Sequence, residues 1–201
     1  MKKIAVLVSG SGTNMQSIIN STKDGILNGV AEVALIISNN ASAFALERAK
    51  KEKIKFACVD RKLFQDDLSY NEAILNELNC NNIDIVCLAG YMKMVGKNII
   101  NFYRDRILNI HPALLPKYGG KGMYGHFVHQ AVIDGHEKQS GATVHHADES
   151  YDTGKMIIQR EVPVFENDTP QILAKRVLEV EHKIYPLAIK KIIENLNKGV
   201  K

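Results

Sequence analysis

The segment Asn109-Ile110-His111-Pro112 carries an amide and an imidazole two residues apart. It closes a short apolar run that is typical of a strand, and period-two alternation then points Asn109 and His111 to the same side. A strand of this kind ends at the carboxyl edge of its sheet, where an amide donor beside an imidazole suits a carbonyl whose oxygen becomes negative. The alternative is a capping Asn and an incidental His.

An acidic loop runs from Asp148 to Gly154 between two further apolar stretches, and Asp152 is its central carboxylate. A carboxylate in this loop could pair with His111, raise its pKa and hold its orientation. The alternative is a solvated hairpin loop, which is the commoner setting for acidic residues near glycine.

A glycine turn, Ser9-Gly10-Ser11-Gly12-Thr13-Asn14, follows the first apolar run. Glycines allow a tight turn, and the N–H groups at the start of a helix then face an anion. No Gly-Lys-Ser/Thr follows, so the turn is not a Walker loop; Met15 stands where a dinucleotide fingerprint needs its third glycine. The turn suits one small phosphate, and a plain tight turn is the alternative.

Alternating apolar runs and amphipathic stretches must position these residues. We expect strands at 4–8, 33–37, 56–59, 83–88 and 107–110, and helices at 14–23, 43–51, 68–78 and 97–103. This alternation predicts a parallel sheet covered on both faces, with ligands at the carboxyl ends of its strands.

The second half changes character. Residues 112–125 form a long loop rich in Gly and Pro, which is usually functional. A helix should follow and close at Gly135 in the left-handed conformation. Residues 141–147 and 156–164 are typical of two more strands that could be antiparallel, and Thr169 can cap a last helix that Pro186 should kink. The expected fold is a single-domain, doubly wound α/β sheet of about seven strands, parallel in the N-terminal half and mixed in the C-terminal half.

Composition excludes several classes of protein. The 201 residues are 45% apolar and carry a net charge of +4, which is too weak and scattered for a nucleic-acid binder. Three Cys argue against a disulfide framework, and we expect Cys58, Cys80 and Cys87 to be packing residues in a reducing compartment. No signal peptide or membrane span is expected, which favours a cytoplasmic protein. The close His pairs lack Cys at ligand spacing, so no metal site is expected.

Several runs, in this order, together resemble the folate-dependent phosphoribosylglycinamide formyltransferases of purine biosynthesis. The likeness covers nearly the whole chain. Its motifs are Val8-Ser9-Gly10-Ser11-Gly12-Thr13-Asn14-Met15-Gln16, Ile37-Ser38-Asn39-Asn40, Leu88-Ala89-Gly90-Tyr91-Met92-Lys93, Leu108-Asn109-Ile110-His111-Pro112-Ala113-Leu114-Leu115-Pro116, Gly141-Ala142-Thr143-Val144-His145, Asp152-Thr153-Gly154 and Glu181-His182-Lys183-Ile184-Tyr185-Pro186.

The resemblance implies transfer of a formyl group from 10-formyltetrahydrofolate, a co-substrate, to the amine of glycinamide ribonucleotide, without a metal. It implies a Rossmann-like formyltransferase domain, 1–201, with a phosphate-binding half (1–105) and a catalytic and folate-binding half (106–201). It assigns the phosphate, the ribose, the folate and the catalysis to particular side chains: Gly12, Thr13 and Asn14 for phosphate; Glu181 for the ribose hydroxyls; Met92, Lys93, Met94 and Val95, with Asn109 nearby, for folate; and Asn109, His111 and Asp152 for catalysis.

One departure concerns the folate tail. Where some relatives have an Arg, this chain reads Phe64-Gln65-Asp66-Asp67-Leu68. Lys62 or Lys93 could substitute. The resemblance assigns no role to His126 or His146, and the sequence leaves open whether the chain is a monomer or a homodimer.

Other functions compete with this one. A methionyl-tRNA formyltransferase is expected to carry an additional basic C-terminal domain, and a formyltetrahydrofolate hydrolase an N-terminal regulatory domain; 201 residues favour neither. A non-catalytic nucleotide-phosphate binding module would need the glycine turn but not the convergence of Asn109, His111 and Asp152.

Overall fold

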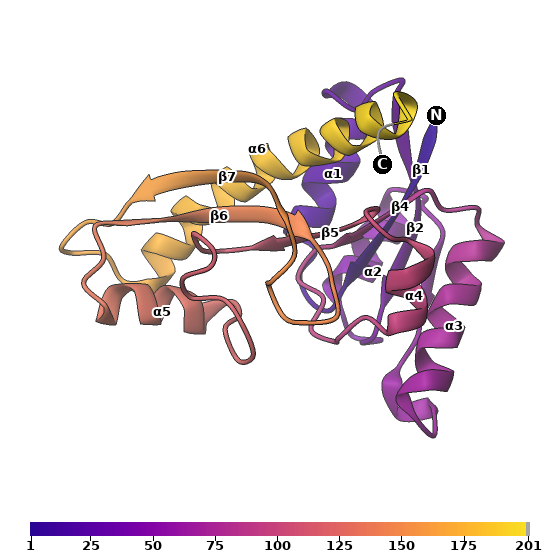
Figure 1. Ribbon diagram of the computed structural model, residues 1–201, viewed down its shortest axis with the longest axis horizontal. Helices are drawn as coiled ribbons and strands as arrows, with labels where there is room; N and C mark the ends of the chain where they lie inside the picture. Colours follow the sequence, from indigo (N-terminus) through magenta and orange to yellow (C-terminus); the bar gives the residue numbers. More distant parts are fainter. Residues whose placement is uncertain (200–201) are drawn as a thin grey trace.

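The computed structural model describes residues 1–199 and contains a seven-stranded sheet in the order β3-β2-β1-β4-β5-β6-β7 (Figure 1). The first five strands pair in parallel, whereas β6 pairs antiparallel with both β5 and β7. The expected fold class, parallel at the start and mixed at the end, is confirmed. The strands are β1 (Lys2–Val8), β2 (Ala31–Ser38), β3 (Phe56–Cys58), β4 (Ile85–Leu88), β5 (Ile107–His111), β6 (Gln139–His146) and β7 (Met156–Pro163).

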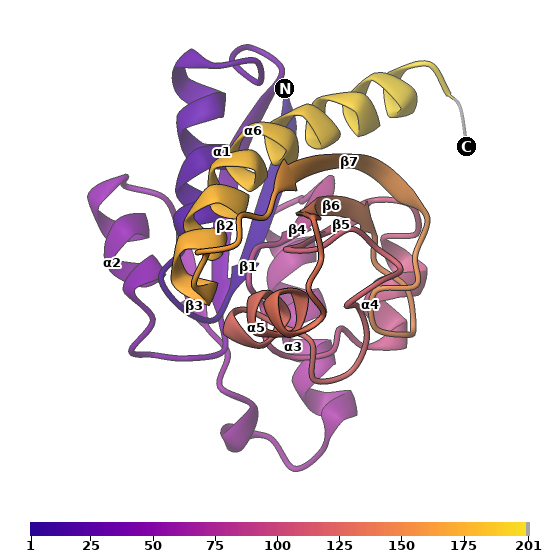
Figure 2. The same ribbon diagram turned by 90° about the vertical axis from the view of Figure 1, so that its left-hand side faces the viewer.

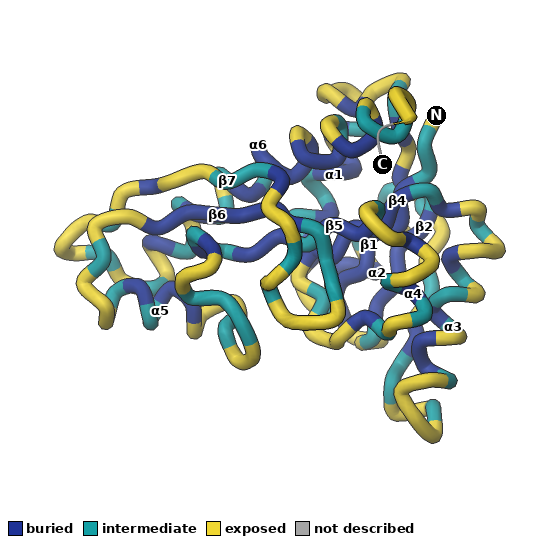
Figure 3. The backbone as a smooth tube through the Cα atoms, in the orientation of Figure 1, coloured by how far each residue is buried: buried dark blue, intermediate teal, exposed yellow. Residues whose placement is uncertain are grey.

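Helices cover both faces of the sheet, as expected for a doubly wound fold. They are α1 (Thr13–Asp24), α2 (Phe44–Lys51), α3 (Asp67–Cys80), α4 (Lys97–Phe102), α5 (His126–Asp134) and α6 (Pro170–Asn197), with a short 3₁₀ turn at Arg61–Leu63. One core cluster joins α1, α2 and α6 to the strands, and a second joins α3 and α4 to the opposite face. Figure 2 shows α1 and α3 on different sides of β1, and Figure 3 shows the buried strands between them.

The order of the strands creates a switch point between β1 and β4, where neighbouring crossovers run in opposite directions. In open α/β sheets, ligands bind at such a point, outside the carboxyl ends of the strands. The loops that follow the two strands are joined there. The Ser9 N–H donates to the Gly90 carbonyl oxygen (3.1 Å), and the Met92 N–H donates to Ser9 Oγ (2.8 Å). The sheet therefore brings the glycine turn beside the start of the segment 90–95.

The long helix α6 begins as the sequence indicates. Thr169 Oγ1 accepts a hydrogen bond from the Ile172 N–H (3.3 Å), and Pro170 occupies the first turn. Pro186 lies buried inside the helix, and the neighbouring Tyr185 hydroxyl contacts the carbonyl oxygens of Leu88 and Leu108. Leu88 is the last residue of β4, and Leu108 precedes Asn109, which pairs with Leu88 in the neighbouring strand β5. This buried contact therefore ties α6 to the sheet close to the site residue Asn109.

Two details of the sequence-based interpretation are wrong. Gly135 has a φ of −76° and continues the last helical turn, whereas the left-handed residue is His136, with a φ of 51°. Glycine is needed at 135 for space, because a Cβ there would lie 2.4 Å from the Tyr118 hydroxyl. Of the three cysteines, only Cys87 is buried; Cys58 and Cys80 are exposed, because each lies at the end of its element.

Among residues 1–199, no helix is both long enough and apolar enough to cross a membrane.

Candidate active site

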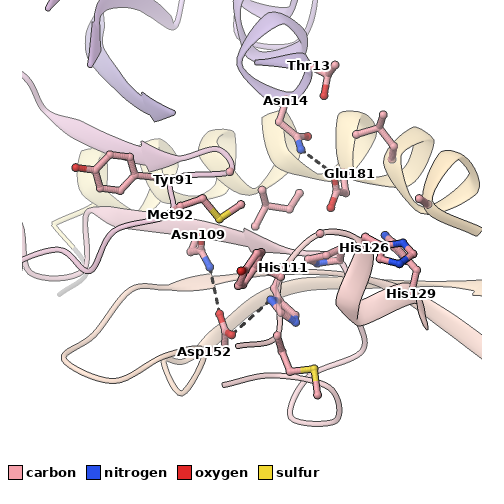
Figure 4. Close-up of a pocket in the computed structure, with 18 of the residues that line it drawn as sticks. Thr13, Asn14, Tyr91, Met92, Asn109, His111, His126, His129, Asp152 and Glu181 are labelled. Atoms are coloured by element: carbon pink, nitrogen blue, oxygen red, sulfur yellow. Dashed lines mark hydrogen bonds and ion pairs between the residues drawn. The ribbon is translucent and has the colours of Figure 1, made fainter. Parts of the chain in front are cut away.

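A cavity of about 910 Å³ opens at the carboxyl edge of the sheet, between the glycine turn, β5 and α6. This volume is typical of a site for small molecules. Its wall brings together side chains from distant parts of the sequence: Thr13 and Asn14 from α1, Met92 from the loop after β4, Asn109 and His111 from β5, Asp152 from the acidic loop, and Glu181 from α6 (Figure 4).

Asn109, His111 and Asp152, here called the β5 cluster, converge in this cavity. Asn109 Nδ2 donates to Asp152 Oδ1 over 3.3 Å, and His111 Nδ1 lies 3.5 Å from Asp152 Oδ2. Both β5 side chains thus reach one carboxylate, which is the same-side arrangement that strand alternation predicts. A capping Asn with an incidental His, or a fully solvated acidic loop, does not account for this convergence.

The loop 112–125 supplies backbone groups that hold the β5 cluster. The Gly120 N–H donates to Asp152 Oδ2 (3.0 Å), and His111 Nε2 donates to the carbonyl oxygen of Tyr118 (2.8 Å). Asp152 itself has a φ of 57°, a left-handed conformation that Asp tolerates better than most residues. The long Gly-rich loop therefore has a structural role in the site as well as forming part of the cavity wall.

In the β5 cluster, burial and the neighbouring polar groups act in opposite directions on the pKa of Asp152 and on that of His111. Burial raises the pKa of Asp152, but the neighbouring His145 and His111 side chains and the Gly120 N–H together bring that pKa below its usual value. Burial lowers the pKa of His111, which is 3% exposed, and this effect outweighs the opposing influence of Asp152 and Tyr118. Asp152 therefore raises the pKa of His111, as expected, but the net shift in the free protein is downward. The reason is desolvation of the imidazolium.

His145 belongs to the same hydrogen-bond network, and sequence reasoning gave it no role. Its Nε2 lies 3.1 Å from Asn109 Nδ2 and 3.5 Å from Asp152 Oδ1, while its Nδ1 donates to the His146 carbonyl oxygen (2.8 Å). The antiparallel register places His145 directly opposite Asn109. The antiparallel pairing of β5 with β6 would have predicted this contact, but the sequence pattern does not specify that pairing.

The glycine turn has the geometry of an anion site. Gly12 adopts a φ of 73°, and a Cβ there would lie 2.8 Å from the Ala45 Cβ, so both the conformation and the space require glycine. No side chain caps the start of α1, which leaves its first N–H groups free for a ligand. Gly12, Thr13 and Asn14 also line a smaller hollow of about 250 Å³ beside the main cavity.

Asn14 and Glu181 meet across the cavity wall. Asn14 Nδ2 donates to Glu181 Oε2 over 2.7 Å, although 167 residues separate them. Glu181 is 7% exposed, and burial raises its pKa despite this hydrogen bond. Asn14 Oδ1 is buried without a partner. The pair therefore keeps an acceptor that a ligand hydroxyl or N–H could satisfy.

The residues assigned to folate lie in two settings. Met92 is exposed and lines the cavity beside Tyr91. Lys93 and Met94 are exposed outside its wall, and Val95 is buried in the core cluster that contains α3. Of the predicted folate residues, Met92 and Asn109 face the cavity, and a folate role for all of them stays a prediction.

Within residues 1–199, no group of three or more His, Cys, Asp or Glu side chains is arranged to hold a metal ion. His126 lines the cavity from the exposed start of α5, whereas His146 has a buried Nδ1 without a partner. Lys62 and Lys93 are both exposed outside the cavity wall, and a contact of either with the folate tail stays a prediction.

Comparison with known proteins identifies the family of the chain. Residues 2–189 match the formyl transferase family. The chain is 42% identical over 190 residues to the phosphoribosylglycinamide formyltransferase of Haemophilus influenzae, covering 94% of this chain and 86% of that protein. It is 39% identical over 189 residues to the trifunctional purine biosynthetic protein adenosine-3 of Chironomus tentans, of which it spans 13%.

A solved structure, glycinamide ribonucleotide transformylase 1 from Symbiobacterium toebii, superimposes with a TM-score of 0.91 at 37% identity. The match covers 97% of this chain and 89% of that one. Sequence and structure thus agree along almost the whole chain. The chain therefore belongs to the formyl transferase family, among the phosphoribosylglycinamide formyltransferases.

Proposed function

We propose that the chain transfers the formyl group of 10-formyltetrahydrofolate to the amine of glycinamide ribonucleotide, in purine biosynthesis. The products are formylglycinamide ribonucleotide and tetrahydrofolate. The observation that carries this proposal is the convergence of Asn109, His111 and Asp152 in a cavity that also reaches the glycine turn. Membership of the family supports the same reaction.

The two substrates occupy different ends of the cavity in this proposal. The phosphate of the ribonucleotide lies on the free N–H groups at Gly12, Thr13 and Asn14, and Glu181 accepts hydrogen bonds from ribose hydroxyls. The folate lies toward Tyr91 and Met92 and reaches Asn109, with Lys93, Met94 and Val95 in the segment behind. This division gives phosphate binding to residues 1–105 and catalysis to 106–201, with Glu181 of the second half completing the nucleotide site.

The β5 cluster stabilises the negative charge of the reaction. The substrate amine attacks the formyl carbon on N10, and the formyl oxygen becomes an oxyanion. Asn109 Nδ2 now donates to His145 (3.1 Å) and to Asp152 (3.3 Å), so the formyl oxygen would replace the longer bond. One preorganised donor of this kind contributes about 3–4 kcal/mol to lowering the barrier.

His111 acts by charge in this proposal. Its Nε2–H donates to the Tyr118 carbonyl oxygen, so in the neutral ring the Nδ1 that faces Asp152 Oδ2 over 3.5 Å carries no proton. Protonation of His111 would place a positive charge beside the oxyanion and an ion pair against Asp152. Because burial lowers the pKa of His111 in the free protein, the charged form must be favoured by the developing negative charge.

The remaining steps break one carbon–nitrogen bond and transfer one proton. As the intermediate collapses, the bond between the formyl carbon and N10 breaks. The attacking amine loses a proton and N10 gains one, through water. Asp152, with its pKa below the usual value, stays ionised at neutral pH and supports His111 in its charged form.

An assay with each substrate omitted in turn tests the proposal. The purified chain, glycinamide ribonucleotide and a formyl folate analogue should yield deformylated folate only when all three are present. Deformylation that persists without the ribonucleotide would instead indicate a hydrolase. Binding of the ribonucleotide with no release of deformylated folate would indicate a non-catalytic nucleotide-binding module.

A further inference from the structure

The N-terminal half of α5 brings a buried imidazole to the cavity wall. His129 is 5% exposed and lines the main cavity, yet its Nδ1 is buried without a hydrogen-bond partner. His126, one turn earlier, also lines the cavity but is exposed. A buried polar nitrogen that lacks a partner destabilises the folded protein, so its presence at a cavity wall points to a ligand.

Packing of α5 does not require this imidazole. Val128 and Val132, four residues apart, are 0% and 1% exposed and supply apolar side chains to the buried face of the helix. An apolar residue at 129 would bury the same surface without leaving a nitrogen unpaired. The side chain therefore has a cost to folding that its packing alone does not offset.

His129 is neutral at physiological pH. Burial lowers its pKa to about 4, and the nearby His126 and His111 side chains act in the same direction. A neutral imidazole has one N–H donor and one acceptor nitrogen, and it suits an uncharged hydroxyl or amide as well as a phosphate oxygen. This distinguishes His129 from a cation that would attract any anion at long range.

The position of His129 selects one of the two substrates. In Figure 4, His129 lies with His126 at the end of the view away from Tyr91 and Met92. The cavity wall also includes Pro170, Gln171 and Ala174 from the start of α6, a helix that packs against α5, and continues along α6 to Glu181. Given the division of the cavity proposed above, this end belongs to the ribonucleotide.

We propose that His129 is a substrate-binding residue that hydrogen-bonds a polar group of the ribonucleotide, and that it contributes to the selection of that substrate. This inference rests on the proposed function. It assigns His129 to binding of the nucleotide, with no direct role in the charge changes at the formyl carbon.

Replacement of His129 by Leu, which removes both ring nitrogens, separates binding from folding. The KM for glycinamide ribonucleotide should rise about five- to tenfold, as expected for the loss of one hydrogen bond. The KM for the formyl folate should stay within twofold. The Tm of the free protein should be unchanged or higher, because the variant no longer buries an unpaired nitrogen. His129→Gln, which keeps an N–H donor, should recover part of the affinity.

His182→Leu is the matched control. His182 also has a buried nitrogen, Nε2, without a partner, but it lies on α6 outside the cavity wall. Both KM values should be unchanged in this variant. A rise in both KM values with a lower Tm for His129→Leu, or no rise in the KM for the ribonucleotide, would overturn the proposal.

Nitrogen NMR of the unmodified protein gives a test that does not depend on folding of a variant. The imidazole resonances of His129 should shift when glycinamide ribonucleotide is added and stay in place when formyl folate alone is added. No shift with the ribonucleotide overturns the inference. If the unmodified protein forms no formylated ribonucleotide, the proposed function itself fails; normal activity with an insensitive His129 removes only this inference.

Discussion

Two groups of polar side chains face the same cavity but differ in how their hydrogen bonds are used. In the β5 cluster, each side chain already has polar partners: Asn109 contacts His145 and Asp152, and His111 contacts Asp152 and Tyr118. The second group is the binding cluster, which we define as Asn14, Glu181 and His129. In it, Asn14 Oδ1 and His129 Nδ1 are buried without partners.

The difference matches two kinds of chemical task. A group that stabilises a transition state is most effective when its dipoles and charges are held in place before the reaction. A group that binds a substrate needs unused donors and acceptors, because saturated groups gain nothing from a ligand. We therefore expect substitutions in the β5 cluster to change turnover and substitutions in the binding cluster to change the KM for the ribonucleotide.

The largest effect is expected for Asn109→Ala. Loss of one oxyanion donor should lower kcat about 100- to 1,000-fold, with much smaller changes in the two KM values. Steady-state kinetics with each substrate varied gives all three constants. Asn101→Ala, an exposed amide on α4, serves as the control and should keep full activity. A large rise in the KM for the ribonucleotide with unchanged kcat would move Asn109 into the binding cluster.

Asp152→Asn is expected to lower kcat at least tenfold while leaving substrate binding largely intact. The amide keeps the shape of the side chain but removes the charge that supports His111. Binding is measured by calorimetry and turnover by deformylation of folate. Glu149→Gln, in the same loop but paired with Lys97 over 2.7 Å, is the control. Unchanged turnover in Asp152→Asn would contradict the role assigned to Asp152.

Glu181→Gln should raise the KM for the ribonucleotide about tenfold, the effect of losing one strong hydrogen bond, with little change in kcat. Glu179→Gln, an exposed residue of the same helix, is the control. An equal change in the KM for formyl folate would show that the two ends of the cavity are not separate.

The same variant carries a prediction about stability. Because the pKa of Glu181 is raised in the folded protein, the folded state binds its proton more tightly than the unfolded state. The free energy of unfolding should therefore fall as pH rises from the ordinary Glu pKa through the raised value, and Glu181→Gln should lose this dependence. Denaturant titrations at several pH values measure this dependence; identical pH profiles for both proteins would contradict a raised pKa for Glu181.

The smallest expected effect is a shift in the pKa of His111, which is measured without an activity assay. Its pKa in the free protein should lie below the ordinary value of 6.5, and Asp152→Asn should lower it further by removing a neighbouring negative charge. An NMR titration of the imidazole protons reports both values. A pKa above 6.5 in the free protein would show that the charge of Asp152 outweighs the effect of burial on His111.

Sequence reasoning was most successful where local pattern and strand topology agree. Alternation along β5 was enough to predict that Asn109 and His111 share a side, and the βα alternation predicted the parallel half of the sheet with its functional carboxyl edge. The same reasoning missed His145 because its partner Asn109 is 36 residues away and is reached through an antiparallel pairing. The sequence also predicted a left-handed conformation for Gly135, whereas glycine is required there because a Cβ would collide with the Tyr118 hydroxyl.

The sequence by itself determined the order of the elements, the family and the residue types that can do the chemistry, because these depend on local periodicity and on motifs. Only the tertiary structure decided how burial acts on those residues. It lowered the pKa of His111 against the influence of Asp152, paired Asn14 with Glu181, and left His129 without a partner. Desolvation and long-range hydrogen bonding depend on which atoms surround a group in space, and neighbours along the chain do not specify them.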